Sequence, residues 1–449
     1  MTTATQSSAQ RRLRVHLGLV GTTTGAVWGA VGLSLVDGVA VRTALSAAPT
    51  ARTALLMAAL LAAIPVGSLL GAPVLDLLSH AVGRRPAALA SGVLVAVGAA
   101  TAAAPRLWTG VAGGLVAGLG IGGYTIVVPK LAHELSERGH RRLVPRVRAL
   151  APAGAGTALG IGVSGGALLP GWGAACAWMA PLASALTACA LVASLPETSH
   201  WYAARGRLDA AHEALKRVHG ALEAAVAIDW VVLEAGMQGE QHPLGVDDLR
   251  IRQVRRTVLA GLVLELVQAL PLGLAAVCLA PWALSAVGGR SWVPLWPALV
   301  LAGLWALLAA AGSRRRSERL LYAWVLGGTG VSACAVVLLV LLERLHGVGA
   351  LVLLIIVAGL LVGGQYVAVV PACTGGIDPM VPPWLLRSQR RAGAVIRPLV
   401  QLLAVLGPAA LLLVSTRVAI AVVLTCQLAS MLLALLALLA LPRAMDILR

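Results

Sequence analysis

The chain has 449 residues, of which 59% are hydrophobic and only 12% are charged, and its formal net charge is +17. Soluble domains carry roughly 25% charged residues, so this composition excludes an ordinary soluble protein. Apolar runs of 18 or more residues recur along the chain, and each can cross a hydrocarbon core of ~30 Å. The runs are continuous rather than alternating, which argues against a β-barrel.

The apolar runs predict an all-α polytopic membrane protein with twelve transmembrane helices. Their approximate limits are 15–36, 53–78, 86–104, 107–129, 149–169, 173–195, 257–286, 292–312, 320–342, 349–372, 394–414 and 416–441. A polar interval separates the sixth run from the seventh. The expected domains are a tail (1–14), a six-helix bundle (15–195), a linker with amphipathic helices (196–256), a second six-helix bundle (257–441) and a second tail (442–449).

The basic residues predict which side of the membrane each loop occupies. If the N-terminus is cytoplasmic, 27 of the 35 Lys and Arg residues fall in cytoplasmic segments and six fall in outer loops. This asymmetry is the positive-inside signal, so we expect a multi-pass protein of the inner (plasma) membrane with both termini in the cytoplasm. The positive charge therefore indicates topology and not nucleic-acid binding, with anionic lipid head groups as secondary contacts.

Three motifs in the first half stand near the ends of the expected spans. The first span ends in "LVDGVAV", which contains Asp37, and the loop after the second span reads Gly83-Arg84-Arg85. The fourth span contains "GLGIGGYTIVVPKLAHELSERGHRR" (118–142), with three glycines at i, i+2 and i+4, followed by a proline and Glu134. Close helix packing alone could explain such glycines, so that reading stays open.

The stretch "LPETSHWYAARGRLDAAHEALKRVHG" (195–220) carries the most specific motif. It resembles the sugar porter branch of the major facilitator superfamily, in which the sixth span ends in Pro-Glu, followed by Trp and then Gly-Arg at fixed offsets. The alternative reading is a plain amphipathic helix from Trp201 to Val218, with apolar residues every three to four positions. Periodicity does not require Pro196-Glu197, Trp201 and Gly206-Arg207 at their observed spacing.

The same family resemblance covers most of residues 15–290, including the glycine run, Asp37 and a gapless match over 267–288. It implies two pseudo-symmetric six-helix bundles that transport a small solute by alternating access, as a secondary (proton-coupled) or facilitative transporter of the sugar porter type. We expect no enzymatic activity, cofactor or metal. It also implies a cytoplasmic gate of ion pairs at helix ends, formed by Arg84, Arg85, Glu134, Arg146, Glu197 and Arg207.

The chain departs from the family where sugar and proton are bound. Gly114 stands where proton-coupled members carry the Arg that pairs with the first-span Asp, and Ile161, Ala269 and Leu274 replace amide side chains of the sugar site. Buried sugar hydroxyls need hydrogen-bond partners, so the fold is better supported than the substrate. Uptake or export of an organic or drug-like solute, and a receptor or scaffold that does not transport, remain alternatives.

A few polar residues lie inside the expected spans. Glu265 is about eight residues into the seventh span with Gln268 at i+3, and an ionisable residue at that depth is by default a functional hypothesis. Glu265 would bind the coupling proton or a cationic substrate; the alternative is a protonated Glu bonded to a neighbouring helix. Asp37 is the second proton-coupling candidate, unless it is a solvated helix end. Gln268, Gln365 and Gln401 are the candidates for binding solute, and we expect a monomer.

Overall fold

The computed structural model describes residues 2–37, 51–104, 107–135, 150–169, 172–240 and 392–403, and a few isolated positions after residue 249. All regular elements in these ranges are helices. Most of the expected second bundle lies outside the described residues, so the division of the chain at 196–256 stays a prediction.

Six helices overlap the six spans expected in the first half of the chain. They are α1 (Thr2–Asp37), α3 (Ala51–Ala81), α4 (Arg84–Ala102), α5 (Leu107–Leu135), α7 (Ala151–Leu168) and α8 (Gly173–Ala193). Three helices follow: α9 (Ser199–Ala203), α10 (Leu208–His219) and α11 (Ala221–Glu240). A further helix covers Ala392–Leu403. Within the described residues, five helices are long and apolar enough to cross a membrane: α1, α3, α4, α5 and α8.

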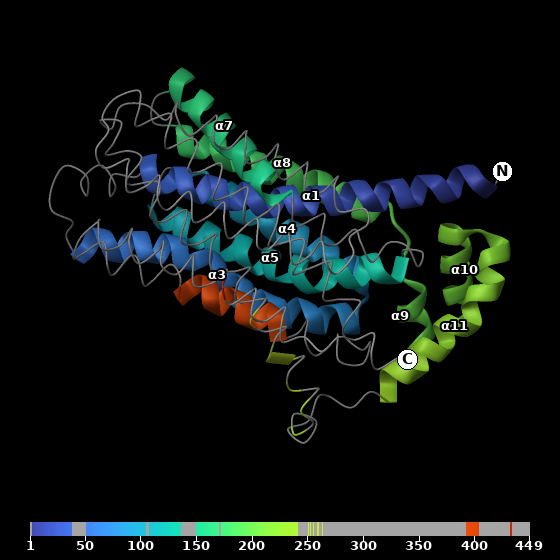
Figure 1. The fold of residues 1–449 in the computed structure, drawn as a ribbon. Coiled ribbons are helices and arrows are strands. Elements are labelled where there is room, and N and C mark those ends of the chain that lie inside the picture. The colour runs from blue at the N-terminus through green and yellow to red at the C-terminus, as the bar shows by residue number, and fades with distance from the viewer. Residues whose placement is uncertain are drawn as a thin grey trace.

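The long helices form two groups of three that pack side by side (Figure 1). Helix α1 packs against α7 and α8, while α5 packs against α3 and α4. Contacts between α4 and α8 and between α1 and α5 join the two groups. The core between them is apolar and contains the fully buried side chains of Trp178, Leu17 and Leu131.

The glycine run of α5 lies in close contact with two neighbouring helices. A Cβ added at Gly118 would lie 3.0 Å from the Cα of Ile64 in α3, and one at Gly122 would lie 2.7 Å from the backbone nitrogen of Ala72 in α3. Gly120 faces α4 instead. Small residues let helix backbones approach this closely, so the packing explanation of the run is confirmed.

Several hydroxyl groups inside the bundle bond within or between helices. Thr23 of α1 donates a hydrogen bond of 2.9 Å to the hydroxyl of Ser184 in α8, and the indole N–H of Trp178 donates one of 2.9 Å to Ser34 in α1. Thr22 and Thr24 bond to carbonyl oxygens of their own helix. Such bonds between helices are common in membrane bundles, where no water is available.

The segment after α8 turns twice at glycines. Gly206 has φ of 71° and follows α9, while Gly220 has φ of 89° and ends α10. Left-handed backbone at these positions stops a helix and favours glycine. One continuous amphipathic helix from Trp201 to Val218 is therefore wrong. Only the second part, α10, has a regular apolar face, on which Ala211, Leu215 and Val218 are buried.

Candidate functional site

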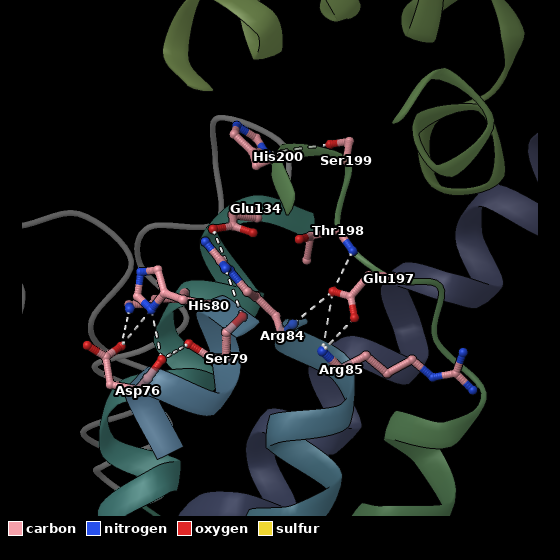
Figure 2. A network of polar contacts seen from close by, with 11 residues as sticks. Asp76, Ser79, His80, Arg84, Arg85, Glu134, Glu197, Thr198, Ser199 and His200 are labelled. Carbon is pink, nitrogen blue, oxygen red and sulfur yellow. Dashed lines mark hydrogen bonds and ion pairs between the residues drawn. The ribbon is translucent and has the colours of Figure 1, made fainter. Parts of the chain in front are cut away.

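Charged side chains gather at one end of the bundle, where α3 ends, α4 begins and the segment after α8 crosses them (Figure 2). The charged cluster comprises five residues: Asp76, Arg84, Lys130, Glu134 and Glu197. They come from three helices and the connection between α8 and α9, and the cluster therefore links elements that are distant in sequence.

Glu197 binds the N-terminus of α4. Helix α4 begins without a side-chain cap, because the residue before it is Gly83. The carboxylate of Glu197 accepts hydrogen bonds from the backbone N–H of Arg84 at 3.0 Å and of Arg85 at 3.1 Å. The first N–H groups of a helix have no partner inside the helix, and the helix dipole favours a negative charge there. Glu197 thus supplies from 113 residues away the cap that the local sequence lacks.

Gly83 makes this approach possible. Its φ of 127° is one that L side chains rarely adopt. A Cβ at this position would also lie 2.9 Å from the carboxyl carbon of Glu197, closer than real Cβ atoms come. Both the backbone conformation and the space occupied by Glu197 therefore require glycine.

Two opposing effects act on the pKa of Glu197. Burial favours the neutral acid and raises the pKa above its ordinary value of 4.5. The hydrogen bonds from the backbone N–H groups of Thr198, Arg85 and Arg84 lower it, and the negative charge of Glu134 raises it further. The net effect is a raised pKa, so the cap is easier to protonate than an exposed glutamate.

Arg84 and Glu134 form the buried ion pair of the cluster. The Nε of Arg84 lies 3.3 Å from Oε1 of Glu134, and the two side chains are only 9% and 10% exposed. Arg84 also donates a hydrogen bond of 2.9 Å to the carbonyl oxygen of Ser79, near the end of α3. One side chain at the start of α4 therefore holds the ends of both α3 and α5.

Lys130 binds Asp76 across the interface between α5 and α3. Lys130 and Glu134 are i, i+4 neighbours on α5, and the carboxylate of Glu134 bonds to Arg84. The sequence carries a usable signal: Asp76 is the one acidic residue between 51 and 82, and a lone acid in an apolar helix needs a basic partner.

Two further arginines hold the same end of the bundle. Arg85 donates a hydrogen bond to the carbonyl oxygen of Ala193 at the end of α8. Arg205 donates to the carbonyl oxygens of His80, at 2.8 Å, and Ala81 at the end of α3, and its guanidinium lies 4.0 Å from the ring centre of Trp201. Basic groups at helix C-termini interact favourably with the helix dipole. Arg205 is not among the residues that the sequence motifs predict for the gate.

The structure brings four of the expected gate residues together: Arg84, Arg85, Glu134 and Glu197. The side chain of Arg207 is exposed at the start of α10 and does not join them in the described part of the chain. Asp37 is the last residue of α1, but its side chain is not described, and Gln401 is half-buried in the helix Ala392–Leu403. Four expected site residues lie outside the described residues: Arg146, Glu265, Gln268 and Gln365.

The model of the family described as "Sugar (and other) transporter" matches residues 25–372, which is most of the chain. The chain belongs to this transporter family. It is therefore a multi-pass membrane transporter and not an enzyme. No curated protein sequence gives a significant match.

Solved structures of sugar transporters share the fold. The proton:xylose symporter XylE bound to 6-bromo-6-deoxy-D-glucose is 17% identical, with a TM-score of 0.70 and 97% of each chain covered. A partially occluded inward-open structure of XylE from E. coli is 16% identical, with a TM-score of 0.67, covering 95% of this chain and 98% of that one. The human organic anion transporter MFSD10 is 19% identical with a TM-score of 0.54, covering 96% and 99%. The chain thus has the major facilitator superfamily fold, and the count of twelve helices stays a prediction.

Proposed function

We propose that this sugar transporter family member is a proton-coupled carrier that moves a small solute across the inner membrane by alternating access. The observation that carries this proposal is the clustering of family motif residues, because Arg84, Glu134 and Glu197 come from three separate motifs and meet at one end of the bundle. These contacts hold the helix ends together in one state, and the opening of a gate would give the same groups other partners or water.

A sugar is the first candidate for the solute. The family description and the xylose symporters of the same fold favour it. An organic or drug-like solute is the second candidate, and one observation favours it: Ile161 of α7 stands at an expected amide position and is 42% exposed. An apolar side chain there offers no hydrogen bond to a sugar hydroxyl.

Glu265 is our proposed site of proton coupling, with Asp37 as the second candidate. The test is transport by the full chain in proteoliposomes, comparing wild type with Glu265→Gln. Two activities are measured. The first is uptake driven by an inward proton gradient, and the second is exchange of labelled for unlabelled solute without a gradient. We expect Glu265→Gln to lose gradient-driven uptake and keep exchange.

Glu343→Gln serves as the matched control, because Glu343 is expected in an outer loop and loses the same charge. Xylose, glucose and an organic cation are tested in parallel, so the same vesicles separate the two solute candidates. Full activity of Glu265→Gln in both assays would contradict the role of Glu265. Absence of flux for every solute with folded wild-type protein would favour the receptor or scaffold alternative.

A further inference from the structure

A pocket of about 310 Å³ lies beside the charged cluster and is lined by basic residues. Four segments line it: Ala9 and Arg12 of α1, Arg85 of α4, residues 193–196 and Arg217 of α10. Its volume is at the lower end of the range of small-ligand sites, roughly 300–1,000 Å³. We propose that this pocket binds a phosphate group through the guanidinium groups of Arg12, Arg85 and Arg217.

The charges around the pocket favour an anion. Three of its described lining residues are arginines, and none is acidic. Glu197, which follows the lining residue Pro196, accepts the backbone N–H groups at the start of α4. Glu213 lies 3.5 Å from the lining residue Arg217. The side chains of Arg217 and Glu213 are both exposed, so their ion pair contributes little to stability. A ligand could therefore replace Glu213 as the partner of Arg217.

Arg85 is held at the wall of the pocket, because one of its terminal nitrogens donates to the carbonyl oxygen of Ala193, which also lines it. Its Nε is enclosed by protein and closed to a ligand, so a phosphate would be bound by the terminal nitrogens. Planar guanidinium groups also match the tetrahedral phosphate, which offers several acceptor oxygens and up to two negative charges.

The position of the pocket allows two sources of phosphate. Arg12 is at the start of one candidate membrane span, and Ala193 is the last residue of another, so the pocket lies at the level of lipid head groups. A soluble phosphate compound could enter from the aqueous side. In either case the ligand would connect α1 and α4 to α10, which belongs to the segment between the two expected bundles. This proposal does not depend on the transported solute.

The test uses the full-length purified protein and the double variant Arg12→Gln/Arg217→Gln, which leaves Arg85 in place. The control is Arg11→Gln/Lys216→Gln, which removes two positive charges from adjacent positions on the same helices but no lining residue. In one arm, glycerol 3-phosphate is titrated onto protein in neutral detergent. In the other arm, the protein is extracted from vesicles that contain both phosphatidylglycerol and phosphatidylcholine. Native mass spectrometry then compares how many molecules of each lipid stay bound to the protein.

We expect the site variant to bind about tenfold more weakly than the control in at least one arm, because hydrogen bonds between arginine and phosphate are charge-assisted. Loss confined to the lipid arm assigns a head group, and loss confined to the soluble arm assigns a cytosolic phosphate compound. Equal binding by the two variants, or no binding by wild type in either arm, overturns the proposal. Arg12→Lys/Arg217→Lys keeps the charge, and an intermediate affinity for it would exclude misfolding as the cause.

Discussion

At the scale of single residues, Gly83 is the position where one added methyl group should matter most. Gly83→Ala would place a Cβ against the Glu197 carboxylate in a backbone conformation that alanine disfavours. We expect a loss of about 2–3 kcal/mol in the free energy of unfolding, the sum of backbone strain and a displaced cap. The matched control is Gly206→Ala, with φ of 71° but nothing within 4 Å of the added Cβ, which should cost only about 1 kcal/mol.

Thermal unfolding followed by tryptophan fluorescence measures both glycine variants in the same detergent. Equal losses for the two would mean that the steric contact with Glu197 adds nothing to the backbone strain. A larger loss at Gly206 would contradict our account of Gly83.

The ionisation of Glu197 predicts a pH dependence. Because burial raises its pKa in the folded protein above 4.5, the folded state binds more protons than the unfolded state between the two pKa values. The contribution of this group to stability is therefore fully present below about pH 4.5 and is lost as the pH rises through the folded pKa. Glu197→Gln cannot titrate, so the melting temperature of wild type minus that of the variant should fall as the pH rises above about 4.5. A difference that grows with pH would show that the N–H bonds to the carboxylate outweigh burial.

At the scale of helices, the charged cluster works as a set of connections between helix ends. The side chains of Arg84 and Glu134 are each about nine-tenths buried, whereas those of Arg217 and Glu213 on α10 are 67% and 52% exposed. Removing one partner of a buried pair leaves an uncompensated charge, so Arg84→Ala should destabilise by about 3 kcal/mol or more.

A double-mutant cycle with Arg84→Ala and Glu134→Ala should show a coupling free energy above about 1 kcal/mol, because the two groups are desolvated together. The same cycle on Arg217 and Glu213 should give about 0.3–0.5 kcal/mol, the usual value for an exposed i, i+4 pair. Chemical unfolding of full-length protein measures both. Similar couplings in the two cycles would mean that the buried pair is open to water.

Much of the helical layout could be predicted from the sequence, because apolar run length alone determines which segments can cross a bilayer. The resemblance groups Glu197 with Arg84 and Arg85 as ion pairs, but it does not predict that Glu197 accepts their backbone N–H groups. No residue near Pro196-Glu197 indicates that the Glu197 carboxylate accepts hydrogen bonds from a helix that begins more than a hundred residues earlier. The pairing of Lys130 was equally ambiguous, since a helix neighbour at i+4 and a residue on the next helix are both within reach.

The family match and the structure support each other at different scales. The motif after the sixth span indicates a family by its spacing, and the structure gives that spacing a physical reason. Pro196 follows the end of α8, Glu197 caps α4, and Gly206 allows the turn into α10. The motif residues thus hold helix ends together, a structural role that does not depend on which solute is carried.

At the scale of the whole molecule, the basic residues predict that the charged cluster faces the cytoplasm. The segments assigned to that side, both tails included, carry 27 of the 35 basic residues, among them Arg84, Arg85 and Arg205. The opposite assignment would place these residues outside the cell. We expect a green fluorescent protein fused after Arg449 to be fluorescent, because it folds in the cytoplasm. Alkaline phosphatase inserted after Ala104, between α4 and α5, should be active outside, and the same enzyme inserted after Gly206 should be inactive. Active phosphatase at Gly206 would reverse the topology and with it the proposal that the cluster belongs to an inner gate.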